Sequence, residues 1–328
     1  MAKLPGSDRT VVLDDGWNTY VDGGLYWSTI YGLGGNDFIR GGRGADIILG
    51  GRGDDSLYGG DGNDILYTDN GYSTDAYPAA TGNDLLDGGR GSDQFYIQGG
   101  TAASIATVYG GLGADRVYVE QDTNYTNIYG GEGGDWIYGL NRSGTILAVG
   151  EDGNDHIFLN QFQGTALDAV PMWRDAIYAG RGNDEIVADN DQVYAGRGDD
   201  RILLQTSLNS HADVMGGPGS DEFRIDGVHF NGLAVGPIEN NAWVVLHDFD
   251  ETDNLSIRMY QTEVRDGPQS GVFGADLDTN ADGFISVADQ DDGASNLRIN
   301  EQWGWLHIQI DQLEIFLPNR PISVDQIF

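Results

Sequence analysis

One short motif constrains the fold of this chain more than any other feature. It is an aspartate with a glycine two residues before it and an apolar residue two residues after it. From Gly41 to Tyr67 the sequence GGRGADIILGGRGDDSLYGGDGNDILY gives nearly the same nine residues three times. The motif places its aspartates at Asp37, Asp46, Asp55, Asp64, Asp84, Asp93, Asp115, Asp135, Asp155, Asp184, Asp200 and Asp221. A repeat of this regularity decides the fold class before any other property is considered.

Each copy of the motif predicts a tight turn followed by a short strand. The preceding glycines are Gly35, Gly44, Gly53, Gly62, Gly82, Gly91, Gly113, Gly133, Gly153, Gly182, Gly198 and Gly219. The apolar residues are Ile39, Ile48, Leu57, Leu66, Leu86, Phe95, Val117, Ile137, Ile157, Ile186, Ile202 and Phe223. Glycine accepts the positive φ of a sharp turn, and one apolar side chain in each short strand can point inward.

The spacing of the aspartates predicts how the strands stack. A spacing of nine residues corresponds to half a coil, and a spacing of about twenty to a whole coil. Two turn-strand units then make one coil of an all-β parallel β-roll, or β-solenoid, whose stacked coils share a thin apolar core. Further half-coils without the turn are expected at 28–34, 106–111, 126–131, 176–180, 192–196 and 213–217. Residues 148–153 depart from this pattern, with Ala148 where a branched residue is usual.

The spacing also assigns each turn to one of two edges of the roll. One edge is expected to carry Asp37, Asp55, Asp93, Asp115, Asp135, Asp155, Asp184, Asp200 and Asp221. The other edge is expected to carry Asp46, Asp64 and Asp84, followed by loops of varied length. In this interpretation the insert at 68–80 replaces one turn on the first edge.

Glycine and aspartate in this arrangement point to calcium. Consecutive bent residues turn their carbonyl oxygens inward, where a hard cation relieves the repulsion, and calcium takes about 6–8 oxygen ligands. An Asp-Gly turn without a metal is the alternative for one copy, but twelve stacked carboxylates would repel one another. The predicted ligands are the twelve aspartates and the turn glycines Gly35, Gly44, Gly53, Gly62, Gly91, Gly113, Gly133 and Gly153. The predicted pairs of turns are 37–55, 93–115, 115–135, 135–155, 155–184, 184–200 and 200–221 on one edge, and 46–64 and 64–84 on the other.

These repeats resemble those of the repeats-in-toxin (RTX, hemolysin-type) calcium-binding family. The segments GGRGADIIL, GGRGDDSLY, GGDGNDILY, GGRGSDQFY, GGLGADRVY and GGEGGDWIY match its nonapeptide, and the resemblance covers about residues 30–225. Leu33 and Glu151 replace the second glycine, and residues 80–84 lack the leading glycine pair. The resemblance implies a parallel β-roll, folding driven by calcium, and type I secretion. It implies no particular activity, since the family attaches such repeats to proteases, lipases, toxins and adhesins.

The C-terminal part is expected to form a separate cap. We place the roll at 1–242 and the cap at 243–328, where residues 244–257 resemble the strand that leads out of the roll in serralysin-like proteins. The segment DTNADGFISVAD fits a 12-residue EF-hand loop with an aspartate at its last position, as in dockerin loops. Its predicted calcium ligands are Asp278, Asn280, Asp282, Phe284 and Asp289, which bring the expected number of ions to about ten. The ending LEIFLPNRPISVDQIF resembles the family's uncleaved export signal, and it also reads as a last core strand.

Composition excludes several classes of partner and site. The net charge of -35 disfavours nucleic acid and anionic membrane surfaces, because phosphate contacts need Lys and Arg. The absence of cysteine excludes disulfides and thiolate metal sites. No segment reaches the ~18 consecutive apolar residues of a transmembrane span. The first residues, MAKLPGSDRT, lack the apolar core of a secretory signal, so the protein is expected either in the cytoplasm or exported by another route, and the resemblance favours export.

The sequence favours a protein without catalytic activity but leaves the question open. Its histidines are His156, His211, His229, His247 and His307, and no HExxH, GxSxG or phosphate-binding glycine loop is present. We expect a structural or adhesive role at the cell surface or in the extracellular matrix. The alternative is a glycan-binding or carbohydrate-active protein that uses loops on one edge of the solenoid. The residues in those loops that suggest it are Tyr125, Arg142, Phe162, Trp173, Arg174 and His211.

Overall fold

The fold was obtained as a computed structural model, and every structural statement below concerns the residues it describes. These are 9–69, 82–98, 104–119, 125–139, 144–159, 175–189, 191–206, 211–229, 242–249, 253–261, 270–272, 284–285, 297–302, 305–310, 313–318 and 322–323. Over these ranges the regular structure is all β. The chain divides into two compact units. Unit 1 is Met1–Gln161 with Trp173–Ala176, and unit 2 is Phe162–Met172 with Ile177–Phe328.

Unit 1 contains fifteen short strands. They are β1 (Arg9–Val12), β2 (Thr19–Val21), β3 (Ser28–Tyr31), β4 (Phe38–Gly42), β5 (Ile47–Leu49), β6 (Ser56–Asp61), β7 (Ile65–Tyr67), β8 (Asn83–Arg90), β9 (Gln94–Ile97), β10 (Ile105–Leu112), β11 (Arg116–Val119), β12 (Tyr125–Glu132), β13 (Trp136–Gly139), β14 (Thr145–Asp152) and β15 (His156–Leu159). The predicted half-coils at 28–34, 106–111 and 126–131 correspond to β3, β10 and β12.

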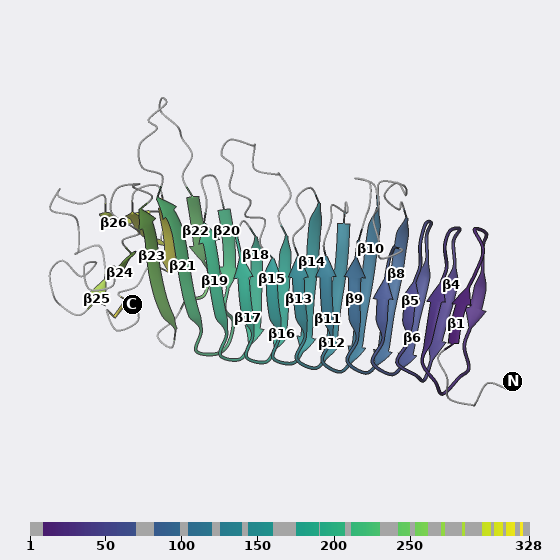
Figure 1. The fold of residues 1–328 in the computed structure, drawn as a ribbon. Helices are drawn as coiled ribbons and strands as arrows, with labels where there is room; N and C mark the ends of the chain where they lie inside the picture. Colours follow the sequence, from purple (N-terminus) through teal and green to yellow (C-terminus); the bar gives the residue numbers. More distant parts are fainter. Residues whose placement is uncertain are drawn as a thin grey trace, which may run out of the picture. The chain divides into compact units, whose positions relative to one another are not determined.

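The strands of unit 1 form two parallel sheets between which the chain alternates (Figure 1). The odd-numbered strands make one sheet and the even-numbered strands the other, each strand pairing with the strand two further along the chain. The register keeps equivalent residues side by side, so Val117 pairs with Phe95 on one side and Ile137 on the other. This alternation confirms the predicted parallel β-roll, with one coil for every pair of strands.

The core of unit 1 is the row of inward side chains predicted from the repeat. In each strand burial alternates with exposure, because successive side chains point to opposite faces. All twelve apolar residues that follow the repeat aspartates are at most 1% exposed, in unit 1 and unit 2 alike. Ala148 on β14 also lies in the core, fully buried although it is small. Longer strands add a second buried residue, as Ile97 does on β9 and Val119 on β11.

The structure corrects the predicted assignment of turns to edges. Turns that lead from the even to the odd sheet form the even-to-odd edge, and it carries Asp46, Asp64, Asp93, Asp115, Asp135 and Asp155 in unit 1. The opposite, odd-to-even edge carries Asp37, Asp55 and Asp84. The predicted pairing of Asp64 with Asp84 was wrong, since Asp64 stacks on Asp93 and Asp55 on Asp84. The step of twenty residues from Asp64 to Asp84 is half a coil lengthened by the insert between β7 and β8, and not a whole coil.

Unit 2 continues the same alternation and ends in antiparallel strands. Its strands are β16 (Ala176–Arg181), β17 (Glu185–Ala188), β18 (Gln192–Arg197), β19 (Arg201–Thr206), β20 (His211–Met215), β21 (Glu222–His229), β22 (Ala242–Leu246), β23 (Asn254–Gln261), β24 (Ser270–Val272), β25 (Phe284–Ile285), β26 (Leu297–Gln302), β27 (Trp305–Ile310), β28 (Leu313–Pro318) and β29 (Ile322–Ser323). Its even-to-odd edge carries Asp184, Asp200 and Asp221. Parallel pairing extends beyond residue 242, through β22 on β20 and β23 on β21. Strand β28 pairs in parallel with β22 and antiparallel with β27.

The predicted EF-hand loop is only partly visible. Phe284 and Ile285 form β25, which pairs antiparallel with β29. The other predicted ligands, Asp278, Asn280, Asp282 and Asp289, lie outside the described residues. The calcium loop in the C-terminal part therefore remains a prediction.

Candidate metal centre

The repeat aspartates form hydrogen-bonded ladders along both edges. On the even-to-odd edge the backbone N–H of each aspartate donates to Oδ1 of the aspartate one coil later. In unit 1 the N···O distances are 2.7 Å for Asp46–Asp64, 2.6 Å for Asp64–Asp93, 2.7 Å for Asp93–Asp115, and 2.8 Å for Asp115–Asp135 and Asp135–Asp155. In unit 2 they are 2.8 Å for Asp184–Asp200 and 3.0 Å for Asp200–Asp221. On the odd-to-even edge Asp37–Asp55 measures 2.8 Å and Asp55–Asp84 3.0 Å.

The second carboxylate oxygen of eleven of the twelve repeat aspartates has no hydrogen-bond partner in the protein. Eleven Oδ2 atoms are buried without a hydrogen bond, those of Asp37, Asp46, Asp55, Asp64, Asp93, Asp115, Asp135, Asp155, Asp184, Asp200 and Asp221. None of these residues is more than 3% exposed. A buried anionic oxygen that lacks a partner is costly, so a repeated arrangement of them indicates a cation that the protein itself does not supply.

Backbone carbonyls converge on the same places. At Gly50, five residues before Asp55, a Cβ would lie 2.5 Å from Asp55 Oδ2 and 3.0 Å from the carbonyl oxygen of Thr68. At Gly59 a Cβ would likewise clash with Asp64 Oδ2 and approach the carbonyl of Gly88. In these two turns the first glycine leaves room beside the unpartnered oxygen, whereas the turns at Asp184 and Asp200 have alanine at the same position, Ala179 and Ala195. Carboxylate and carbonyl oxygens together are the donor set that calcium prefers.

Most of the predicted turn glycines adopt the positive φ that bends each turn, a conformation that glycine accepts without steric cost. Six of the eight have positive φ, namely Gly35 (100°), Gly53 (117°), Gly62 (145°), Gly91 (142°), Gly113 (132°) and Gly133 (140°). At the remaining two, a side chain would clash with the backbone of an adjacent coil, at Tyr26 for Gly44 and at Gly133 for Gly153. Leu33 and Glu151 keep the turn conformation without glycine, at φ values of 75° and 77°.

The electrostatics of the metal-free ladder also favour a bound cation. Burial raises the pKa of Asp55, Asp64, Asp93, Asp115, Asp200 and Asp221 to about 7, and that of Asp46 and Asp135 to about 6. The backbone N–H of the preceding coil lowers the pKa in each case, but by less than burial raises it, and neighbouring carboxylates raise it further. Burial likewise raises the pKa of Asp37, and that of Asp84 well above its usual value. The raised pKa values mean that the surrounding protein groups do not fully stabilise the negative charge of these carboxylates.

The donor set fits a hard divalent cation. Each candidate site combines an aspartate oxygen with backbone carbonyls, and at no described position do three His, Asp or Glu side chains gather around one point. Sites that rely on carbonyl oxygens suit calcium, whereas transition metals prefer imidazole or thiolate ligands.

Comparison with protein families supports the same ion. The model of the RTX calcium-binding nonapeptide repeat, in four copies, matches residues 22–57, 41–74, 79–101, 127–141 and 174–202. The chain carries RTX calcium-binding nonapeptide repeats. The matched segments include turns on both edges of unit 1 and the turn at Asp184 in unit 2. No curated protein matches the chain.

The structure of the RTX chain also reveals buried aspartates that the repeat did not predict. Asp253 takes the ladder position after Asp221, whose N–H donates to its Oδ1 at 3.0 Å. Asp175 accepts the N–H of Ile146 at 2.7 Å, as Asp84 accepts that of Asp55. Asp191 directly precedes β18 and is 1% exposed. Each is followed two residues later by an apolar residue, which is the one part of the motif that sequence analysis could have used to find it. None has glycine two residues before it.

The residues considered for other chemistry lie only partly within the described part of the chain. His247 Nε2 lies 3.3 Å from Asp213 Oδ1, and His211 Nε2 lies 3.9 Å from Asp213 Oδ2, on partly exposed strands of unit 2. Tyr125 begins β12 with 38% exposure. The remaining loop residues of the glycan hypothesis, Arg142, Phe162, Trp173 and Arg174, lie outside the described residues. In the described part of the chain, no helix has the length and hydropathy needed to cross a membrane.

Proposed function

We propose that the protein is exported by type I secretion and folds outside the cell around a ladder of calcium ions, to serve a structural or adhesive role at the cell surface or in the extracellular matrix. The observation that carries the calcium ladder is the set of eleven buried Oδ2 atoms without partners. Burying so many unpaired carboxylates in a chain of net charge -35 would oppose folding. Calcium supplies the missing positive charge at those oxygens.

The corrected edges define the proposed sites. Each ion would sit between consecutive turns of one edge, held by the aspartate Oδ2 and by glycine carbonyls. The turn pairs within unit 1 are 46–64, 64–93, 93–115, 115–135 and 135–155 on the even-to-odd edge, and 37–55 and 55–84 on the odd-to-even edge. The pairs within unit 2 are 184–200, 200–221 and 221–253. These ten pairs and the EF-hand loop together give an expectation of about eleven ions.

Calcium-dependent folding is the most direct test of this proposal. We expect the chain in excess chelator to show little β structure by circular dichroism, and to gain it cooperatively as calcium is added. Magnesium at the same concentration is the control, because it demands near-octahedral geometry and gives up its water reluctantly. A spectrum that does not change between chelator and calcium would refute the proposed function. Calorimetry that finds three or fewer ions would refute the ladder.

The extracellular location follows from the same dependence. A chain that needs many moderate-affinity calcium sites stays unfolded where free calcium is scarce and folds where it is abundant. Export through a type I system would then deliver an unfolded chain, with the C-terminal segment as its address. Fusing residues 243–328 to an unrelated passenger, with a type I system co-expressed, tests the address. Retention of the passenger inside the cell would contradict it.

Glycan binding is the second candidate, and the exposure of Tyr125 favours it. This ring begins a strand next to the odd-to-even edge and is 38% exposed, and aromatic side chains can stack on sugar rings. Loops held by a rigid scaffold often carry recognition. A glycan array probed with the calcium-loaded protein tests it, followed by Ala at Tyr125, Phe162 and Trp173. Binding that survives the triple substitution unchanged would place the site elsewhere.

A further inference from the structure

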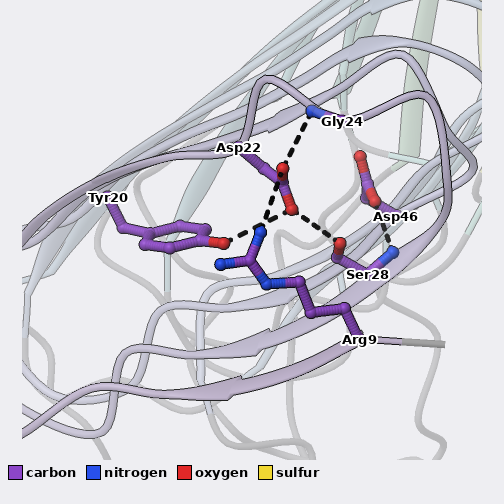
Figure 2. Close-up of polar contacts among 6 residues, drawn as sticks. All are labelled: Arg9, Tyr20, Asp22, Gly24, Ser28 and Asp46. Atoms are coloured by element: carbon purple, nitrogen blue, oxygen red, sulfur yellow. Dashed lines mark hydrogen bonds and ion pairs between the residues drawn. The ribbon is translucent and has the colours of Figure 1, made fainter. Parts of the chain in front are cut away.

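The first turn of the even-to-odd edge, whose polar contacts are drawn in Figure 2, differs in chemistry from the turn at Asp46 that follows it. It runs from Asp22 to Ser28, between β2 and β3. Strand register aligns Ser28 with Asp46 and places Asp22 opposite Gly41. Compared with the turn at Asp46, this one therefore has its carboxylate at the position of the first glycine and a hydroxyl at the position of the aspartate.

This exchange of positions agrees with the limited space beside Gly41. A Cβ at Gly41 would clash with Asp46 Oδ2 and lie 2.8 Å from the carbonyl oxygen of Gly59. In this first turn, where Asp22 takes the first position, the last position has a shorter side chain. Ser28 provides it, and its Oγ donates to Asp22 Oδ2 at 2.8 Å.

Both oxygens of Asp22 have protein partners, unlike those of the ladder aspartates. Oδ1 accepts the N–H of Gly24 at 2.9 Å and lies 3.5 Å from the Arg9 guanidinium, while Oδ2 accepts from Ser28 Oγ and, at 3.3 Å, from Tyr20 OH (Figure 2). Arg9 also lies 5.7 Å from the centre of the Tyr20 ring. By contrast, Asp46 Oδ1 accepts the N–H of Ser28 at 2.6 Å, and its Oδ2 has no partner.

We infer that the turn at 22–28 is a calcium-independent cap that closes the N-terminal end of the even-to-odd ladder. Here protein groups do what calcium does at the later turns. Arg9 supplies the positive charge, and Gly24, Ser28 and Tyr20 donate hydrogen bonds to the carboxylate of Asp22. The cap also fixes Ser28, whose N–H satisfies Oδ1 of Asp46 and so orients the first ladder carboxylate. Arg9 is 59% exposed and its contact is long, so the neutral donors do most of the stabilisation of Asp22. This inference rests on the proposed calcium ladder.

Asp22→Asn tests the cap against a metal-ligand role, with Asp46→Asn as the comparison. In saturating calcium we expect native mass spectrometry to give the same number of ions for Asp22→Asn as for the wild type, and at least one fewer for Asp46→Asn. We expect amide hydrogen exchange over residues 19–31 to become about tenfold faster in Asp22→Asn, with the later coils unchanged. One fewer ion in Asp22→Asn would make Asp22 a ligand and overturn the inference, and so would unchanged exchange.

Two milder variants keep the test decisive if Asp22→Asn does not fold. Ser28→Ala removes only the Oγ donor and leaves the N–H that Asp46 accepts, and Arg9→Gln removes only the charge. Arg43→Gln is the matched control, because Arg43 is an exposed arginine that lies 3.8 Å from an exposed carboxylate, Asp61. The cap is supported if Ser28→Ala exchanges faster at residues 19–31 while its ion count is unchanged. Arg43→Gln should not show this faster exchange. Exchange that is unchanged in both Ser28→Ala and Arg9→Gln, or an ion lost in either, overturns it. A wild-type chain that binds no calcium would instead refute the proposed function.

Discussion

The backbone N–H of Asp64 donates a 2.6 Å hydrogen bond to Oδ1 of Asp93, which lies 29 residues further along the chain. The other oxygen of Asp93 is buried and has no partner. In such a ladder aspartate, one carboxylate oxygen therefore accepts a hydrogen bond from the protein, and the other is left for a cation. The hydrogen-bonded oxygen fixes the rotamer of the side chain. The other oxygen lies where backbone carbonyls converge, so it can bind a cation. The arrangement makes folding and ion binding interdependent.

Removing one ladder carboxylate should remove at least one ion. In Asp135→Asn we expect a lower calcium count and a free energy of unfolding in saturating calcium that is lower by about 3 kcal/mol, the linkage free energy of a ligand present at about 150 times its Kd. Glu132→Gln is the matched control, because it removes the same charge from an exposed position of the same turn. Native mass spectrometry and calcium-saturated urea unfolding measure both effects. Equal ion counts in the two variants would contradict the ladder.

Acid should weaken calcium binding over the range in which the ladder titrates. Burial raises the pKa of Asp64, Asp93 and Asp115 to about 7, so protons compete with calcium for these oxygens near neutral pH. We expect lower calcium affinity at pH 5.5 than at pH 8, and protons released on binding at pH 7. Calorimetry in two buffers of different ionisation enthalpy counts those protons. Binding that releases no protons and is independent of pH would argue against aspartate ligands of raised pKa.

The metal-free chain should respond to pH in the opposite direction. A carboxylate whose pKa is higher in the folded state than in the unfolded state stabilises the fold fully below its unfolded pKa, and loses that contribution as pH rises through the folded value. Without calcium, residual β structure should therefore increase as pH falls from about 8 toward 5, because Asp64 and Asp93 become protonated near pH 7. Circular dichroism in chelator measures it. Less structure at pH 5 than at pH 8 would be the contrary result.

Restoring glycine at one strained turn should stabilise the roll. Glu151 has a φ of 77°, in the left-handed region where non-glycine residues cost about 1–2 kcal/mol. We expect Glu151→Gly to raise the free energy of unfolding in calcium by about 1 kcal/mol after the entropy of the unfolded chain is subtracted. Glu151→Ala is the control, because it removes the carboxylate and keeps the strain. If the two variants are equally stable, charge and not backbone strain sets the effect.

A stack of aromatic rings should stabilise unit 1 independently of calcium. The Tyr118 ring lies between those of Tyr96 and Tyr138, with centroids 5.1 and 5.4 Å away and nearly parallel planes. Aromatic pairs contribute about 0.5–1.5 kcal/mol each beyond burial, so Tyr118→Ala should lower the free energy of unfolding by about 2 kcal/mol without changing the ion count. Tyr26→Ala, at an exposed tyrosine, should change it little. An ion lost from Tyr118→Ala would show that the stack supports the turns as well.

Local sequence specified the repeat unit and its inward side chain. Glycine at the bend, aspartate at its end and one apolar residue two positions later can be satisfied only by a turn followed by a strand whose alternate side chains are buried, and Phe95 and Ile137 are fully buried as expected. The same spacing indicated calcium, because the need for oxygen ligands is a property of the turn itself. These conclusions depend on interactions within about nine residues.

Only the tertiary structure decided which turns stack on one another. The step from Asp64 to Asp84 is close to a whole coil in length, yet it is half a coil with an insert, and no local property of residues 68–81 distinguishes the two. Asp253 escaped detection because its ladder position is set by the N–H of Asp221 across the sheet, and not by a glycine beside it. Asp22 is likewise defined by Ser28 and Arg9, which lie on different strands. Stacking is a relation between coils, so a sequence fixes it only where every coil has the same length.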